Sequence, residues 1–276
     1  MYAVLFAFIS ALIYSIENVL PKYLKRMDAI DIIILRELLM LIPLTPFFIE
    51  KFSSISLLLI LFGFLLGFIP YFAFLKAVKM GKAGVVIALS QTHNIFSIFF
   101  SLLLFSILPP KTYIIPLMLM LLAIGILYLS KPYSFDFLPI MYSLIAAILW
   151  GLQAVIIKHY FANISPWDLV YFTELGLFLT ALFYVIFKKK KITKPVFKGE
   201  YICLIIMAYG ALIALYFYIK SLQLSEHPSL PLIILPSSTI LSCLWAYLLF
   251  KEKLKLREIF AVILSIIAVI IASIKI

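Results

Sequence analysis

Long apolar runs fill the chain from end to end, and short connectors rich in Lys, Arg or Pro separate them. The runs are about as long as the ~20 apolar residues that an α-helix needs to cross a bilayer. They are continuous rather than alternating, and they exceed the ~10-residue strands of a membrane β-barrel. The pattern therefore predicts ten transmembrane helices, over residues 2–22, 30–49, 56–78, 84–106, 112–130, 137–158, 167–187, 201–222, 228–250 and 256–274.

The composition points to the same class of protein. Of the 276 residues, 66% are hydrophobic and 13% are charged, and the mean hydropathy is +1.20. A soluble domain carries about 25% charged residues, so this chain has too few of them to cover a globule in water. The same values exclude a disordered chain, a coiled coil and a disulfide scaffold. We expect an all-α integral membrane protein without a separate soluble domain.

The net charge of +11 is best explained by the membrane. In a soluble protein it would suggest nucleic acid, but here Lys and Arg cluster at helix ends, where they meet anionic lipid head groups. We therefore expect membrane lipid and no nucleic acid as the partner of these residues. One side of the predicted bundle holds 17 of the 23 Lys and Arg, and the side with both termini holds 5. Because cytoplasmic loops carry the positive excess, both termini are expected outside the cell membrane.

The sequence carries no pattern typical of an enzyme or of a cofactor site. A glycine-rich phosphate loop and a Gly-x-Ser-x-Gly nucleophile elbow are both missing. His93, His159 and His227 lie on different predicted helices without the spacing of metal ligands. Cys203 and Cys243 lie inside apolar runs, which predicts small buried side chains rather than a disulfide. We expect no cofactor, no metal and no catalytic residue.

The chain also repeats itself. Ala11–Leu24 aligns with Ala147–Tyr160, and Phe74–Asn94 aligns with Tyr218–Ser238. The halves, residues 1–131 and 132–276, each hold five predicted spans, and an odd number gives them opposite orientations. Inverted repeats of this kind build many secondary transporters, whose solute site lies near the membrane midplane between the repeats. The first aligned pair of stretches places Tyr14 on Trp150 and Glu17 on Gln153, and the second places His93 on Ser237. One extra residue in the loop after the first stretch places Asp31 on Asp168 and Glu37 on Glu174.

The second half is similar to a known family. Tyr218–Ala272 contains a Tyr-x-Lys-Ser-Leu start, Pro236 within a helix, and Glu252 in a polar hinge before the last helix, and it resembles the end of an EamA-type repeat. The two aligned openings, Ala11–Leu24 and Ala147–Tyr160, resemble the small-aromatic-small start of such repeats. The resemblance extends over nearly the whole chain and is to the drug/metabolite transporter superfamily. It implies a ten-helix transporter whose central cavity lies between helices 1, 3, 4, 6, 8 and 9.

The first half departs from this pattern. Leu108 and Pro109 stand at the hinge where the second half has Glu252 and Lys253. The superfamily resemblance also implies termini on the cytoplasmic side, whereas the distribution of Lys and Arg places them outside. We follow the charge distribution for the orientation.

Charged side chains inside a membrane need a partner or a hydrated cavity, because each costs at least ~2.5–3.5 kcal/mol to insert. Glu17 shares one face of the first helix with Tyr14, and Trp150 with Gln153 occupies the aligned face of the sixth helix. This pattern suits a solute pocket with a few polar groups among apolar walls. The alternative is that Glu17 forms a structural ion pair with Arg36. Glu37 and Glu174 are interpreted as packing or structural groups.

The fourth predicted helix carries Ser90–Asn94, a run of hydrogen-bonding side chains near its middle. His93 could relay a proton or make a neutral interhelical hydrogen bond. The aligned part of the ninth helix has Pro236, followed by hydroxyl side chains, and Pro236 is either a hinge that contacts solute or a simple kink. Aromatic rings of the third and eighth helices, such as Tyr71 and Tyr218, are candidates for the cavity wall or for packing.

Together these features predict a secondary transporter that moves a small metabolite, an amino acid or a related polar organic solute, by alternating access. The family resemblance implies export, and an integral-membrane enzyme and a channel are the alternatives. Glu17 and His93 are the candidates for proton coupling, and Pro236 is the candidate hinge. The predicted substrate-binding residues are Tyr14, Glu17, Asn18, Tyr71, Gln91, Thr92, His93, Asn94, Trp150, Gln153, Tyr216, Tyr218, Ser237 and Ser238.

Overall fold

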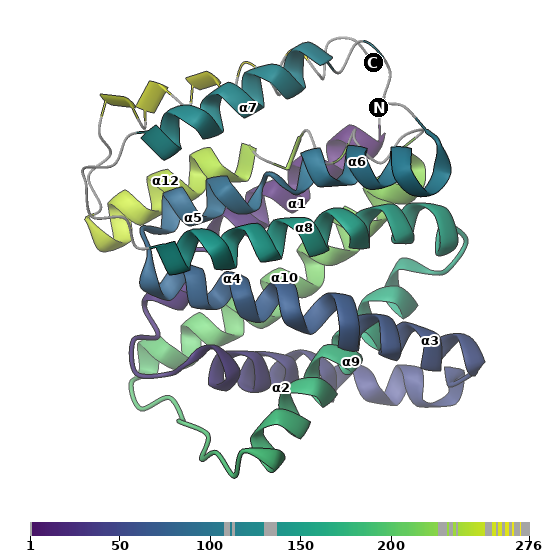
Figure 1. Ribbon diagram of the computed structural model, residues 1–276. Helices are drawn as coiled ribbons and strands as arrows, with labels where there is room; N and C mark the ends of the chain where they lie inside the picture. The colour runs from purple at the N-terminus through teal and green to yellow at the C-terminus, as the bar shows by residue number, and fades with distance from the viewer. Residues whose placement is uncertain are drawn as a thin grey trace.

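The computed structural model is an all-helical bundle throughout its described part (Figure 1). The structure describes residues 2–107, 111, 114–129, 137–225, 231, 234–235 and 237–251, together with scattered residues between 256 and 271. Short 3-10 turns η1 and η2 and a π-helical segment η3 join several of the helices. The helices are α1 (Tyr2–Glu17), α2 (Ala29–Phe48), α3 (Ser54–Phe62), α4 (Phe68–Met80), α5 (Ala83–Ser90), α6 (His93–Phe105), α7 (Ile114–Leu129), α8 (Phe137–Tyr160), α9 (Pro166–Phe187), α10 (Lys198–Leu224) and α12 (Ser237–Phe250), and the short segments are η1 (Leu20–Lys22), η2 (Ile49–Lys51) and η3 (Gly63–Gly67).

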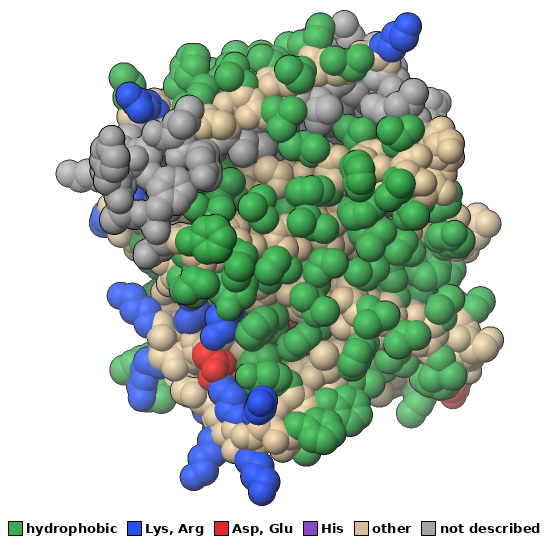
Figure 2. Space-filling model, viewed as in Figure 1, with side chains coloured by type: hydrophobic (Ala, Val, Ile, Leu, Met, Phe, Trp, Pro, Cys, Tyr) green, Lys and Arg blue, Asp and Glu red, His purple; other side chains and the backbone are tan. Residues whose placement is uncertain are grey.

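Seven helical stretches are long and apolar enough to cross a membrane, judged by length and composition over the described residues. They match the first four predicted spans and the sixth to the eighth. α7 and α12 fall within the predicted fifth and ninth spans, and only scattered residues of the tenth are described. The outer face between the helix ends is mainly hydrophobic, and Lys and Arg gather at the left of the view (Figure 2). The protein is therefore a multi-pass membrane protein.

Two predicted continuous helices are interrupted in the structure. The third span breaks into α3, η3 and α4, because Pro70 has no N–H to donate to the preceding turn and the chain adapts through a π-helical segment. The fourth span breaks between Ser90 and His93. There the hydroxyls of Ser90 and Thr92 donate to the carbonyls of Ile87 and Leu89, and such local bonds compete with the helical ones. Both interruptions lie next to the polar interior described below.

The helices pack through long crossings. α1 lies along α10 and contacts α12, α8 lies against α4 and α6, and α9 crosses α2 and α3 (Figure 1). Serine hydroxyls link α1 to α10. Ser10 donates to the Ala214 carbonyl at 2.9 Å, and Ser221 donates to the Ala3 carbonyl at 2.8 Å. A hydroxyl bond between helices satisfies a polar group that would otherwise lie in an apolar interior.

The crossing of α9 with the third span has direct backbone contact. A Cβ atom at Gly63 would lie 1.9 Å from the Thr173 carbonyl oxygen, and one at Gly176 would lie 2.0 Å from the Ile60 carbonyl oxygen. Only glycine permits this approach, which is typical of helix pairs packed through small residues. The contact fixes α9 at Thr173 and Gly176 and so sets the position of Glu174, which lies between them.

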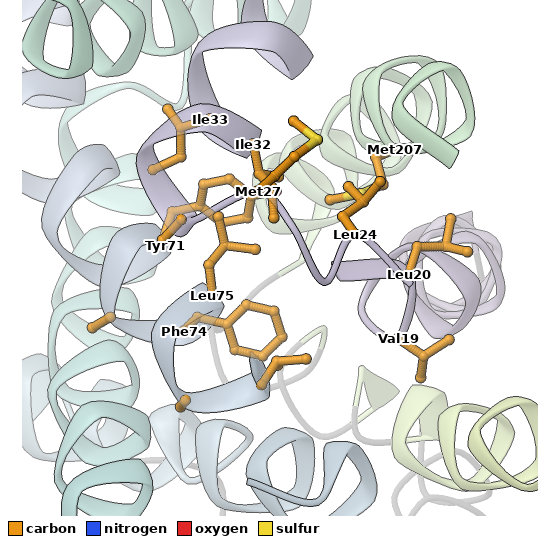
Figure 3. Close-up of a cluster of buried hydrophobic side chains, with 14 of the residues drawn as sticks. Val19, Leu20, Leu24, Met27, Ile32, Ile33, Tyr71, Phe74, Leu75 and Met207 are labelled. Carbon is orange, nitrogen blue, oxygen red and sulfur yellow. The ribbon is translucent and has the colours of Figure 1, made fainter. Parts of the chain in front are cut away.

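A cluster of buried apolar side chains packs the α1–α2 connector against the neighbouring helices (Figure 3). It joins Leu24 and Met27 of this connector to Phe74 of α4 and Met207 of α10. The ammonium of Lys79 donates to the Leu24 carbonyl at 2.6 Å, which holds the same connector against the end of α4. The connector is thereby part of the buried core.

At this end Lys190, in the segment after α9, bridges to the start of α2. Its ammonium pairs with Asp28 at 3.1 Å and with Asp31, and Asp28 and Asp31 also cap α2 through reciprocal backbone hydrogen bonds. Partial burial raises the pKa of Asp28, but the hydrogen bonds from the Asp31 N–H and from Lys190 outweigh it, and the pKa lies below its usual value. The same carboxylates hold the pKa of Lys190 above its usual value despite its own burial. The α9–α10 segment is thereby attached to the first half of the chain.

Gly176→Ala is predicted to destabilise the protein by about 3 kcal/mol, because the added methyl group must separate two backbones in contact. Gly210→Ala is the matched control in α10, since its Cβ would meet Ile13 at an ordinary 3.5 Å. Unfolding in detergent by heat or denaturant measures both. Equal stability of the two variants would contradict the close crossing.

Lys190→Met is predicted to lower the melting temperature at pH 7 by a few degrees, whereas Lys191→Met in the same run is neutral. The Asp28 contribution is present above the unfolded-state pKa of about 3.9 and is lost as the pH falls through the lower folded-state pKa. The difference between wild type and Lys190→Met should therefore shrink below about pH 4. A difference that stays constant between pH 7 and pH 3 would argue against the bridge.

Candidate functional site

A cavity of about 120 Å³ lies inside the bundle, among residues from both halves of the chain. Its walls combine charged, amide and aromatic side chains, a mixture typical of small-molecule sites. The lining residues are Tyr14, Glu17, Asn18, Arg36, Gly67, Tyr71, Phe74, Ser90, Gln91, His93, Trp150, Gln153, Glu174, Leu177, Leu215, Tyr218 and Leu235.

Arg36 is the centre of a buried charge cluster on one wall. Its Nη1 lies 2.5 Å from Glu37 Oε1 and 3.5 Å from Glu174 Oε2, and its Nε lies 3.7 Å from Glu17 Oε1. The guanidinium also stacks over the ring of Tyr71, 4.4 Å from the centroid, and the Tyr71 hydroxyl donates to Glu17 at 3.4 Å. The cluster connects α1, α2, α4 and α9.

This geometry bears on the two alternatives for Glu17. The carboxylate is close enough to Arg36 for an ion pair, yet 3.7 Å is longer than a hydrogen bond, and its Oε2 has no hydrogen-bond partner. Glu17 also lines the cavity. The ion pair and the cavity position therefore coexist, and Glu37, fully buried against Arg36, is the tighter partner.

Aromatic rings form a second wall. Phe74 lies 5.3 Å from Trp150 between ring centroids, and His93 meets the Trp150 ring edge-on at 6.5 Å. Tyr14 and Tyr218 complete the set that lines the cavity. The backbones of α8 and α6 are in contact at Gly151, where a Cβ atom would lie 2.8 Å from the His93 carbonyl oxygen. This close contact brings the neighbouring Trp150 ring next to His93.

The interruption between α5 and α6 brings polar groups to the cavity. Ser90, Gln91 and His93 line it, and His93 Nδ1 lies 3.0 Å from the Ser90 carbonyl oxygen. Gln91 is nine-tenths buried, and its Oε1 has no hydrogen-bond partner. Thr92 instead turns its hydroxyl to the Leu89 carbonyl.

Most of the predicted binding residues meet at this cavity, and some do not. Tyr14, Glu17, Asn18, Tyr71, Gln91, His93, Trp150, Gln153 and Tyr218 line it, whereas Thr92, Asn94, Tyr216, Ser237 and Ser238 do not. Tyr216 stacks on Trp167 with ring centroids 4.5 Å apart. Asn94, Ser237 and Ser238 are buried with side-chain polar atoms that lack hydrogen-bond partners. The predicted hinge Pro236 lies outside the described residues.

The sequence pattern did not predict several apolar residues of the wall, among them Leu177, Leu215 and Leu235. A signal for two of them was present. The alignment of Phe74–Asn94 with Tyr218–Ser238 places Leu235 on Gln91, and continued by three residues towards the N-terminus it places Leu215 on Tyr71. Extending the aligned pairs to apolar partners would have found both. Leu177 carried no such signal.

The described residues contain no group of three or more His, Cys, Asp and Glu that could hold a metal ion. Cys203 and Cys243 are buried and are not joined in a disulfide. The side chains that line the cavity offer ionic, hydrogen-bonding and aromatic contact.

Comparison with known proteins gives the family. The model of the EamA-like transporter family matches residues 1–129 and again residues 137–274. The chain belongs to the EamA-like transporter family. This family is part of the drug/metabolite transporter superfamily, so the resemblance found in the sequence is confirmed. A transporter family in turn favours a small solute and a lipid environment over catalysis.

Solved structures support the fold of this EamA-like protein. One, described only as "Crystal structure of protein", has a TM-score of 0.79, with 14% identity over 99% of each chain. At this identity the likeness shows the fold alone. Among curated protein sequences, none matches the chain.

Arg36→Gln is predicted to destabilise the EamA-like protein by about 3–5 kcal/mol, because it leaves buried carboxylates without their cation. Arg26→Gln, the same change at an exposed site, is the control. Adding Glu37→Gln to Arg36→Gln should restore part of the loss by removing one carboxylate. Thermal unfolding in detergent measures all three. A single Arg36→Gln variant as stable as wild type would refute the role of the cluster.

Proposed function

We propose that this protein is a secondary carrier that moves a small polar organic solute, of the amino acid type or related to it, through the cavity. The observation that carries the proposal is the cavity itself. It lies within a membrane bundle of a transporter family and presents Arg36, Glu17 and Glu174 beside the rings of Trp150 and Phe74. A few polar groups among apolar walls are what a solute site requires.

The repeat supports alternating access as the mechanism. We propose two inverted five-helix halves, 1–131 and 132–276, with the cavity between them. The family model matches once in each half. Aligned residues of the two halves line the same cavity, as expected if two similar units rock about a shared site: Tyr14 with Trp150, Glu17 with Gln153, Tyr71 with Leu215, Phe74 with Tyr218 and Gln91 with Leu235.

The moving elements follow from the interruptions of the helices. At the break between α5 and α6 the backbone makes three-residue hydrogen bonds, such as Thr92 N–H to the Leu89 carbonyl, and we assign gating to this break and to the aligned segment around Pro236. Any proton coupling is assigned to Glu17 or His93, which line the cavity. We further propose export, with the Lys-rich side cytoplasmic and both termini outside.

Trp150→Ala is predicted to reduce transport at least about tenfold, because it removes a ring from the cavity wall. Trp167→Ala is the matched control, since Trp167 stacks on Tyr216 away from the cavity. The measurement is counterflow of amino acids, amines, sugars and nucleosides in proteoliposomes.

Saturable uptake with counterflow identifies a carrier. Uptake that rises linearly with solute concentration, without counterflow, would identify a channel-like protein and overturn the proposal. Equal loss of transport in the Trp150 and Trp167 variants would place the solute path elsewhere.

A further inference from the structure

The charge cluster holds more acid than base. Glu17, Glu37 and Glu174 surround the single positive charge of Arg36, and Glu37 and Glu174 share a proton in the hydrogen bond between them, which leaves an excess of one negative charge. All four side chains are at least nine-tenths buried, and the ion pairs that the structure shows for these carboxylates all lead to Arg36. Buried charge is costly unless it is paired, so this excess calls for a cation.

The unbalanced carboxylates face the cavity. Glu37 takes the shortest contact with Arg36, at 2.5 Å, and it is not among the lining residues. Glu17 and Glu174 do line the cavity, and their distances to Arg36, 3.7 and 3.5 Å, leave them weakly held. The negative excess is therefore displayed to whatever occupies the cavity.

The polar atoms without partners are independent evidence for the kind of ligand. Four buried polar atoms of the described wall have no hydrogen-bond partner. Glu17 Oε2, Glu174 Oε2 and Gln91 Oε1 are acceptors, whereas Arg36 Nε is a donor and lies 3.7 Å from Glu17 Oε1. Acceptors therefore outnumber donors three to one. A primary ammonium group carries three donors and one positive charge, so it can satisfy acceptors of this kind and reduce the excess at the same time.

The rest of the wall suits the apolar part of such a molecule. The rings of Tyr14, Phe74 and Trp150, with Leu215 and Leu235, surround the remaining space. Aromatic faces also attract cations, most strongly where water is excluded. The volume of about 120 Å³ limits the ligand to a small molecule.

We propose that the cavity binds a small primary amine as its cation, with the ammonium group between Glu17, Glu174 and Gln91 and its apolar part against Trp150 and Phe74. A carboxylate on the same molecule weakens binding, because the cation available to it, Arg36, is already shared by three glutamates. The site thus selects the amine over the corresponding amino acid. This inference rests on the proposed function, since it names the solute class of the same cavity.

The test compares matched ligands on the purified protein in detergent, with affinity measured by calorimetry and by tryptophan fluorescence. Two pairs of ligands differ only by a carboxylate: 2-phenylethylamine with phenylalanine, and isoamylamine with leucine. A third comparison, of 2-phenylethylamine with 2-phenylethanol, replaces the ammonium group by a hydroxyl. Each amine should bind at least about tenfold more tightly than its amino acid or alcohol counterpart, which corresponds to 1.4 kcal/mol.

Variants locate the ammonium site. Glu17→Gln and Glu174→Gln should each weaken amine binding at least about tenfold, since each removes a charged acceptor. Glu50→Gln, the same change at an exposed glutamate, should leave it unchanged. If one of the two variants fails to fold, the other variant and the ligand pairs measured on wild type still test the ammonium site.

Amino acids that bind as tightly as the amines, or amine binding that survives both variants, would overturn the inference. Transport of the same compounds in proteoliposomes separates this failure from that of the proposed function. Saturable flux of amino acids without flux of amines would overturn the amine site and leave the carrier. No saturable flux of any cation, zwitterion or neutral solute would overturn both.

Discussion

The ion cluster around Arg36 is the interaction on which the interior of this protein depends. One guanidinium holds carboxylates from α1, α2 and α9 and stacks on an aromatic ring of α4. In an apolar bundle these groups have few other partners, so the cluster fixes how the four helices meet. Because the cluster sets one basic group among three acidic ones, it also gives the adjacent cavity its electrostatic character. Structure and specificity are linked at this one side chain.

Close backbone crossings hold this cluster in place. Gly63 and Gly176 let α9 touch the third span on either side of Glu174, and Gly151 brings α8 onto α6 beside Trp150. The π-helical segment η3 and the break between α5 and α6 lie beside the same cavity, where irregular backbone is tolerated because protein rather than lipid surrounds it. Rigid crossings next to weakened helices are a suitable arrangement for a carrier whose halves move about a fixed site.

The sequence was sufficient for the class of protein and for much of the cavity wall. Long apolar runs predict spanning helices because the bilayer sets their length, and polar residues inside them mark the interior because lipid cannot solvate them. Residues such as Glu17, Trp150 and Gln153 were found in this way. Periodicity did not reveal the break at Ser90–His93, since hydroxyl competition for carbonyls is a local effect. Periodicity also placed Tyr216 wrongly in the cavity wall. Its ring stacks on Trp167 instead, and a small rotation of the helix separates these two positions.

The central claim is that the cavity is a solute site reached in turn from each side of the membrane. Thiol labelling of a Gln153→Cys variant with a membrane-impermeant reagent tests it most directly, because Gln153 lines the cavity and the native Cys203 and Cys243 are buried. The account predicts reaction from either face of the membrane, slowed by a saturating transported solute. Reaction from one face alone, at a rate that no solute changes, would contradict it.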